Sequence, residues 1–268
     1  VKPMTFPNAS GKRVNMMYPT DYTYWTKLKS FVDYDPLSAI NAETGGVLAS
    51  IGIVRGQPFN STDKQKAALE KAVTIAPKMI LASRQLGRAD KRNLYYTDRQ
   101  YENAWCGATS ENFQETYLDI DQRAAYYQYA YSSAPAMAMR TLGAGSKYPF
   151  TTRDVDGNFL NGSNIYKLHL PPNPPASLFW AVTAYNVTDG TMPETEQLLP
   201  STNGYYDLPK NQDGSIDIWF APKQPDGVAD AAFIQTVPNR HFLVALRLYG
   251  TGVEFFDQTW KPDDVVKV

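Results

Sequence analysis

The residues best suited to catalysis in this 268-residue chain are two histidines and several aspartates. A serine or cysteine hydrolase of the usual kind needs a histidine base, so it would have to use His169 or His241. No Gly-x-Ser-x-Gly turn is present to place a serine nucleophile. Five aspartates could instead pair for general acid and base work: Asp154, Asp156, Asp213, Asp217 and Asp257. Hydrolysis is therefore an alternative interpretation, not the first one.

Metal and thiol chemistry have less support in the sequence. Zinc would need several Cys or His ligands at close spacing, and the chain has one cysteine and two separated histidines. Asp154-x-Asp156-Gly157 resembles the start of a calcium loop, but no glutamate follows at the position that would complete it. Cys106 is better explained as a small buried residue than as a nucleophile. We expect no metal and no cofactor.

Arg247 stands between Leu246 and Leu248 in an apolar segment. An arginine there either points to the outer face of a strand or is buried and paired. Asp213 or Asp217 could be its partner. A structural role is the preferred interpretation, and ligand binding is the alternative.

The chain is rich in tyrosine from Asp90 to Tyr131. A closely spaced group of tyrosines cannot all face one core, so some hydroxyls must reach solvent, a polar partner or another subunit. An ordinary interface is one interpretation, and an aromatic platform for a ligand is the other. The candidate ligand-binding tyrosines are Tyr126, Tyr127, Tyr129 and Tyr185.

Residues 1–135 are predicted to form a helical and irregular region that packs on the rest of the chain. Apolar residues recur at helical spacing in three segments: 20–35, 62–87 and about 119–131. Thr62 and Gln65 suit a capping box, and Gly87 can end the helix that they begin. Pro77 should kink or split that helix.

Residues 136–268 are predicted to form an antiparallel β-sandwich of jelly-roll type, which makes the whole chain α+β. Short alternating segments are separated by Gly, Pro, Asp and Asn turns, as in such sandwiches. Asp213-Gly214 is a hairpin signal before a strand at 216–220. The expected core includes Leu168, Phe179, Val182, Ile216, Ile218, Leu243 and Leu246.

Composition excludes some partners. The formal net charge is -1 and no basic block stands out, so electrostatics give no reason to expect nucleic acid. No apolar run approaches the roughly 20 residues of a membrane span. The chain starts with Val1 and shows no signal-peptide pattern, so we interpret it as processed or cut from something longer.

Several motifs occur in a characteristic order in the C-terminal half. They are 154–162 (DVDGNFLNG), 166–168 (YKL), 179–185 (FWAVTAY), 213–215 (DGS) and 246–250 (LRLYG). This series resembles the C-terminal part of bacterial proteins that pair the domains of unknown function numbered 1254 and 1214, and mainly the 1214 domain. The resemblance spans roughly residues 118–260, and residues 1 to about 100 look like the segment that joins the two domains.

The resemblance implies a jelly-roll-like domain, a periplasmic or secreted setting and a tendency to oligomerise, but no reaction. Its N-terminal domain is not found here, so a companion domain could be a partner. We therefore predict an exported, oligomeric binding or assembly protein of unknown ligand. The alternative is a hydrolase that uses paired carboxylates or a site shared with the missing domain.

Overall fold

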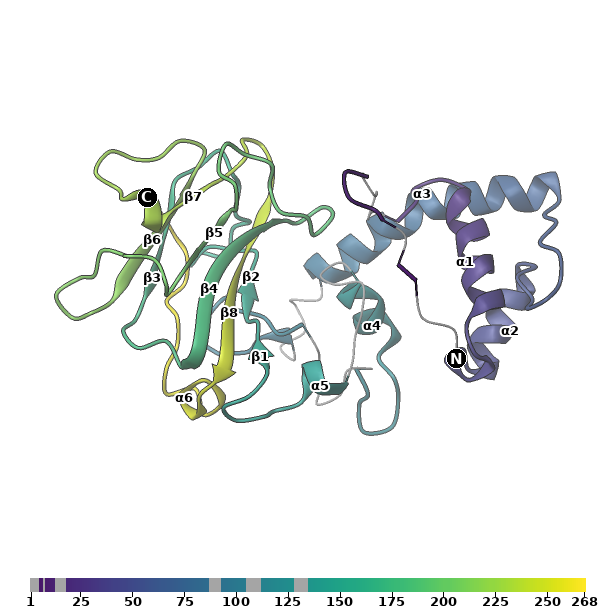
Figure 1. The fold of residues 1–268 in the computed structure, drawn as a ribbon, viewed down its shortest axis with the longest axis horizontal. Helices are drawn as coiled ribbons and strands as arrows, with labels where there is room; N and C mark the ends of the chain where they lie inside the picture. The colour runs from purple at the N-terminus through teal and green to yellow at the C-terminus, as the bar shows by residue number, and fades with distance from the viewer. Residues whose placement is uncertain (1–4, 7, 13–17, 87–92, 105–111, 128–134) are drawn as a thin grey trace. The chain divides into compact units, whose positions relative to one another are not determined.

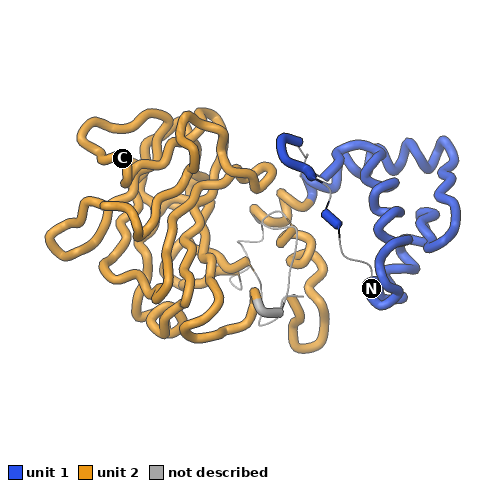
Figure 2. Tube along the Cα trace, viewed as in Figure 1, with its two compact units in different colours: residues 1–79 blue, residues 80–268 orange. Residues whose placement is uncertain are grey.

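The computed structural model describes residues 5–6, 8–12, 18–86, 93–104, 112–127 and 135–268 (Figure 1). The chain divides into two compact units (Figure 2). We call residues 1–79 the helical unit and residues 80–268 the sheet unit. Among the described helices, none combines the length and the apolar character that a membrane crossing requires.

The helical unit contains α1 (Thr23–Tyr34), η1 (Leu37–Ala39), α2 (Ala42–Ser50) and most of α3 (Asp63–Leu86). The predicted capping box is confirmed: the Gln65 amide donates to Thr62 Oγ1 at 3.3 Å, and the Thr62 amide donates to Gln65 Oε1 at 3.0 Å. Pro77 lies inside a single helix, so of the two predicted outcomes, a kink or a split, the split does not occur. Gly87, the predicted helix end, lies outside the described residues.

The sheet unit has three short α-helices, α4 (Ile120–Tyr126), α5 (Pro135–Ala138) and α6 (Val253–Phe256), and the turn η4 (Asp230–Ala232), within its described residues. Asp119 caps α4, because its carboxylate accepts the Gln122 amide at 3.1 Å. This start agrees with the predicted helix at 119–131. The last residues of that prediction lie outside the described ones.

Two open sheets make up most of the sheet unit. The strands are β1 (Ser146–Lys147), β2 (Phe150–Thr151), β3 (Tyr166–Leu170), β4 (Ala176–Asn186), β5 (Ser201–Asn203), β6 (Ile216–Ala221), β7 (Phe233–Gln235), β8 (Phe242–Thr251) and β9 (Val266–Lys267). One sheet has the order β1-β8-β4-β5, with β2 also paired to β8, and the other has the order β7-β6-β3-β9. The mixed α and β composition agrees with the predicted class, and the finer jelly-roll assignment stays a prediction.

One hydrophobic core joins the two sheets. Alternate residues of each strand point to the same face, and both sheets direct such residues into a shared buried cluster. Members of the cluster are Tyr166, Leu168 and Leu170 from β3, Val182 and Ala184 from β4, Ile216, Ile218 and Phe220 from β6, and Phe242, Val244, Leu246 and Leu248 from β8. Most of the predicted core residues belong to it.

Two of the predicted core residues lie elsewhere. Leu243 is buried, but on the other face of β8, in a second cluster with Phe150 and Ala245. Phe179 is half-buried and contacts the rings of Tyr205 and Tyr249. Strand alternation explains both positions. Leu243 is next to Val244 and Phe179 is next to Trp180, which both face the core, so Leu243 and Phe179 point to the opposite face.

Two predictions about connections are also wrong. β7 runs parallel to β6, so the sheets are not wholly antiparallel. Asp213-Gly214 does form a tight turn, closed by the Gly214 amide donating to the Asn211 carbonyl at 2.9 Å. The turn precedes β6 without making a hairpin, because the antiparallel partner of β6 is β3, which lies much earlier in the chain.

Candidate functional site

The outer face of the five-stranded sheet carries the candidate site. On β8, Leu243, Ala245 and Arg247 alternate with the core residues and point to this face. β4 pairs with β8 in register and adds Tyr185 opposite Leu243. The alternation that fills the core with every second residue therefore places an arginine and a tyrosine together on the opposite side.

These residues line a cavity of about 210 Å³, which we call the arginine cavity. Its described lining comes from both sheet strands and surrounding segments, and it consists of Ala104, Tyr126, Met137, Tyr148, Phe150, Tyr185, Gly190, Leu243, Ala245 and Arg247. Most of these side chains are apolar or aromatic. Arg247 is the one charged residue in this described lining, so it dominates the local electrostatics.

A hydroxyl network surrounds Arg247. Its Nη2 donates to the Tyr249 hydroxyl, and its guanidinium lies 5.4 Å from the ring centre of Tyr148 and 5.5 Å from that of Tyr249. Ser146 Oγ donates to the Tyr148 hydroxyl at 2.6 Å. Aromatic faces attract a guanidinium and hold it in place at half-buried positions. The arginine head is thus fixed in position at the cavity wall.

The network shifts the pKa values of its members in opposite directions. Burial opposes ionisation of Tyr148, but hydrogen bonds from Ser146 and Tyr249 and the charge of Arg247 lower the pKa of its hydroxyl. Burial and the hydrogen bond to Tyr148 raise the pKa of Tyr249 to about 12. Burial alone would lower the pKa of Arg247, yet the surrounding tyrosines raise it. The guanidinium therefore stays charged.

No carboxylate in the described part of the chain forms an ion pair with Arg247. Of the two alternatives for Arg247, the outward-facing one is observed, and Asp213 and Asp217, the partners considered for a buried pair, are elsewhere. Asp217 is in β6 of the other sheet, where it pairs with His169 of β3, and Asp213 is in the turn before β6. They cannot neutralise Arg247 because the shared core separates the faces of the two sheets.

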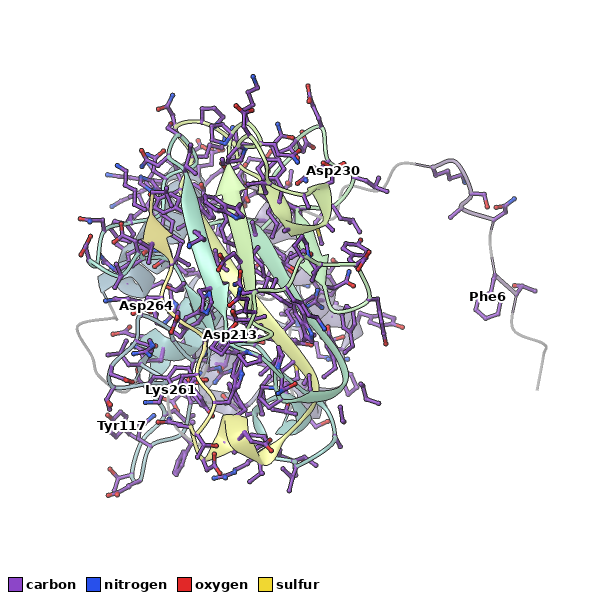
Figure 3. All side chains as sticks on the ribbon, turned by 90° about the vertical axis from the view of Figure 1, so that its left-hand side faces the viewer. Phe6, Tyr117, Asp213, Asp230, Lys261 and Asp264 are labelled. Atoms are coloured by element: carbon purple, nitrogen blue, oxygen red, sulfur yellow. The ribbon has the colours of Figure 1, made fainter. Side chains whose placement is uncertain are left out.

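The outer face of the four-stranded sheet holds a separate polar cluster. His169 Nδ1 lies 2.7 Å from Asp217 Oδ1, and Lys167 Nζ lies 3.5 Å from Asp217 Oδ2. Asp213, in the turn before β6, is labelled in Figure 3, which views the molecule from this side. The Ser215 hydroxyl chiefly lowers the pKa of Asp213, and His169 adds to the effect. The cluster is a partly exposed ion-pair group.

The other candidate residues stay apart from both groups. Asp154 is buried, and its Oδ1 accepts the amides of Asp156 and Asn158 at 3.1 and 2.8 Å, so it holds a turn. Asp257 accepts the Thr259 amide at 3.0 Å. His241 is exposed, and its Nδ1 lies 3.1 Å from the Leu160 carbonyl oxygen.

The predicted tyrosine platform is partly assembled. Tyr126 and Tyr185, which are far apart in the sequence, line the same cavity as Arg247. Tyr127 follows α4 and is half-buried, and Tyr129 lies outside the described residues. Sequence reasoning missed Tyr148 and Phe150, because they belong to no recognisable helix or strand pattern. The available signal was the pair of aromatic residues on either side of Pro149.

The described part of the chain contains no recognisable metal site. There, no three His, Cys, Asp or Glu side chains gather in a way that could hold an ion. Asp154, which resembled the start of a calcium loop, directs an oxygen to backbone amides. Cys106 lies outside the described residues.

Comparison with known proteins identifies one region of the chain. Residues 145–253 match the family described as protein of unknown function (DUF1214). The chain therefore contains a DUF1214 domain, which includes Tyr148, Tyr185 and Arg247 but not Tyr126. No curated protein matches the chain.

Two solved structures are distantly similar. The VPA0106 protein from Vibrio parahaemolyticus is 19% identical with a TM-score of 0.47, covering 96% of this chain and 59% of that chain. An uncharacterised protein from Burkholderia cenocepacia is 12% identical with a TM-score of 0.34, covering 92% of this chain and 52% of that chain. The present chain thus spans little more than half the length of either protein.

Proposed function

We propose that the sheet unit is a binding protein for a small organic acid, which occupies the arginine cavity. The observation that carries the proposal is the charged guanidinium of Arg247 at the wall of a largely apolar cavity, without a carboxylate partner among the described residues. The ligand would place an acidic group on Arg247 and an apolar body against Phe150, Leu243 and Ala245.

The physical reason is the cost of a half-buried cation. A charge removed from water must be paired or hydrogen-bonded, and tyrosine hydroxyls and rings compensate a guanidinium only in part. An arginine presents parallel N–H donors that match a carboxylate, and such charge-assisted bonds are among the strongest hydrogen bonds in proteins. A carboxylate ligand would therefore complete the network around Arg247.

The cavity also limits ligand size. Sites for drug-sized molecules have volumes of roughly 300 to 1,000 Å³, and the arginine cavity has about 210 Å³. Tyr126, buried at 7% exposure, and Tyr185 contribute flat aromatic surface. A short aliphatic or single-ring carboxylic acid fits this combination of volume and lining.

Calorimetric titration with matched compounds tests the proposal. Benzoate and hexanoate should bind, whereas benzamide and hexanamide, with similar shape but no charge, should bind at least about tenfold more weakly. Arg247→Met should weaken acid binding by roughly 10- to 100-fold, which corresponds to a hydrogen bond to a charged group. Equal binding of acids and amides, or unchanged binding to Arg247→Met, would overturn the proposal.

Arg153→Met is the matched control. Arg153 also stacks on an aromatic ring, with its guanidinium 3.9 Å from the centre of Phe159, and it donates to the Gly157 carbonyl at 2.7 Å. It does not line the arginine cavity. Loss of acid binding in this variant as well would indicate a general effect of removing a stacked arginine.

Export, self-association and a companion domain remain part of this proposal, as does the jelly-roll type of the sandwich. The DUF1214 match at residues 145–253 supports the 1214 part of the resemblance from which these features were expected. Native mass measurement of the purified protein tests the assembly. A single-chain mass at working concentration would remove self-association from the proposal.

The hydrolase alternative has less support. Within the described residues, Asp154 and Asp257 bind local amides, and the hydrogen bond described for the His169 ring is to Asp217 and not to a serine or cysteine nucleophile. His169→Ala and Asp217→Asn should leave acid binding unchanged, because both lie on the other sheet. Hydrolysis of an ester panel that disappears in either variant would favour the alternative over binding.

A further inference from the structure

A second cavity adjoins the arginine cavity. It has a volume of about 250 Å³, and its described lining is Tyr95, Asn103, Ala104, Ala138, Arg140, Lys147, Tyr148, Pro149, Phe255, Phe256 and Gln258. Ala104 and Tyr148 line both cavities. The two cavities therefore adjoin at these shared side chains.

The lining of the second cavity differs in chemistry from that of the first. It contains the amides of Asn103 and Gln258 and two cationic side chains, so it is the more polar of the two. Gln258 Nε2 already donates to the Tyr95 carbonyl at 2.7 Å. The cations are therefore the groups that decide which ligand end this cavity could accept.

Lys147 is occupied by the backbone. Its Nζ donates to the carbonyl oxygens of Met137, Ala138 and Met139 at 3.2, 3.3 and 2.6 Å. These bonds satisfy all three donors of an ammonium group. Burial also lowers the pKa of Lys147. It therefore holds the end of α5 in place and has no donor left for a ligand.

Arg140 differs from Lys147 in its contacts. Its guanidinium lies 4.9 Å from the ring centre of Phe256, and no ion pair with a carboxylate is formed in the described part of the chain. Its charge contributes to the lowered pKa of Asp257, although the Thr259 hydroxyl is the larger cause. Within the described residues, the second cavity thus has an arginine over the Phe256 ring whose charge acts on Asp257 without an ion pair.

We infer that the two cavities form one bipartite site for an elongated ligand with an acidic group at each end. Arg247 takes one end and Arg140 the other, and the middle of the ligand passes Tyr148 and Ala104. The inference rests on the proposed function for the Arg247 end. It adds the Arg140 end, and with it the ligand class of α,ω-dicarboxylic acids or comparable two-ended anions.

The two ends should differ in strength. Arg140 is exposed and Arg247 is half-buried, and an exposed charge is screened by water and salt. The Arg140 end should therefore add about three- to fivefold in affinity, and this gain should shrink at high salt. The Arg247 end should supply most of the binding and depend less on salt.

The test is titration of the full chain with two series of equal chain length, monocarboxylates and α,ω-dicarboxylates from six to twelve carbons. The dicarboxylates should bind more tightly above a threshold length, at which the second acid reaches Arg140. Arg140→Met should remove this advantage and leave monocarboxylate binding unchanged. Asp257→Asn should enlarge the advantage, because it removes the carboxylate that offsets Arg140.

Three results would overturn the bipartite site. They are equal affinities in the two series at every length, a dicarboxylate advantage that survives Arg140→Met, and a threshold that Arg140→Met shifts without removing the advantage. Monocarboxylate binding separates this failure from failure of the proposed function. Monocarboxylates that bind through Arg247 without a dicarboxylate advantage overturn only the inference, whereas no binding in either series overturns both.

Discussion

Arg84 Nη2 lies 2.7 Å from Glu102 Oε2, and both side chains are almost fully buried, at 2% and 3% exposure. The Arg84 guanidinium also lies 4.9 Å from the ring centre of Phe150. Phe150 lines the arginine cavity, and Glu102 pairs with it through the backbone in both directions. The buried ion pair therefore holds Phe150, and with it one wall of the arginine cavity, in position.

Breaking this pair should destabilise the sheet unit strongly. Glu102→Gln leaves Arg84 charged and buried, and such a change costs about 3 to 5 kcal/mol. Arg84→Met combined with Glu102→Gln should cost less than the two single changes together, because neither then leaves a buried charge. Urea unfolding of the four proteins in this cycle measures the difference, and additive effects would contradict it.

Two neighbouring tyrosines provide a matched pair for hydrogen-bond energetics. The Tyr95 hydroxyl donates to the Phe255 carbonyl at 2.8 Å, whereas the buried Tyr96 hydroxyl has no partner among the described residues. Tyr95→Phe should destabilise by about 1 kcal/mol, and Tyr96→Phe should be neutral or stabilising. Both rings stay in contact with Phe255, so packing is preserved. Equal losses in the two variants would contradict this assignment.

The free energy of unfolding of the sheet unit should fall at alkaline pH. Burial raises the pKa of Tyr95 to about 12, and it also raises the pKa values of Tyr96 and Tyr101. Above pH 10 the unfolded chain loses these phenolic protons while the folded protein keeps them, so stability is complete below pH 10 and falls as pH rises toward 12.

Urea unfolding at pH 8, 10 and 11 should therefore show a decreasing free energy of unfolding. Tyr95→Phe should lose part of this pH dependence, since the phenylalanine has no proton to release. A variant with the same slope as the unmodified protein would show that Tyr95 does not contribute.

Among the described glycines, Gly162 should be the least tolerant of a side chain. A Cβ added there would lie 2.1 Å from the Val237 carbonyl oxygen, so backbone would have to move. Gly162→Ala should cost at least about 2 to 3 kcal/mol. Gly157→Ala is the control, because its Cβ meets open space and its φ of +81° alone costs about 1 to 2 kcal/mol. A smaller loss at Gly162 than at Gly157 would contradict the prediction.

Local signals in the sequence predicted most of the elements. Thr62 with Gln65 predicted the start of α3, and Asp119 marks the start of α4. α2 was not predicted, and it contains Gly45 and Gly46, which disfavour a helix. Asn41 was the available signal, since its side chain accepts the Thr44 amide at 2.7 Å and caps that helix. Short helices thus depend on caps more than on composition.

Long-range pairing was beyond the sequence. The alternation in 216–220 predicted a strand, but nothing local indicates that β3 and β7 are its neighbours or that β7 is parallel. The same limit explains the site. Arg247 was identified as unusual, yet its surroundings depend on Tyr148 and Tyr185, which the register of β1, β4 and β8 brings near it. From the sequence, Asp217 was a reasonable ion-pair partner for Arg247, and only the strand topology shows that it lies on the other sheet.

The strict alternation of β8 between core and cavity has a consequence for how this domain can change over evolution. Leu246 and Leu248 fill the core while Arg247 between them faces the cavity. Insertion or deletion of one residue within the strand would exchange the two sets, burying the guanidinium and exposing leucines. Fold and site would be lost together, so homologues that keep the fold should vary in length at the loops and not within β8.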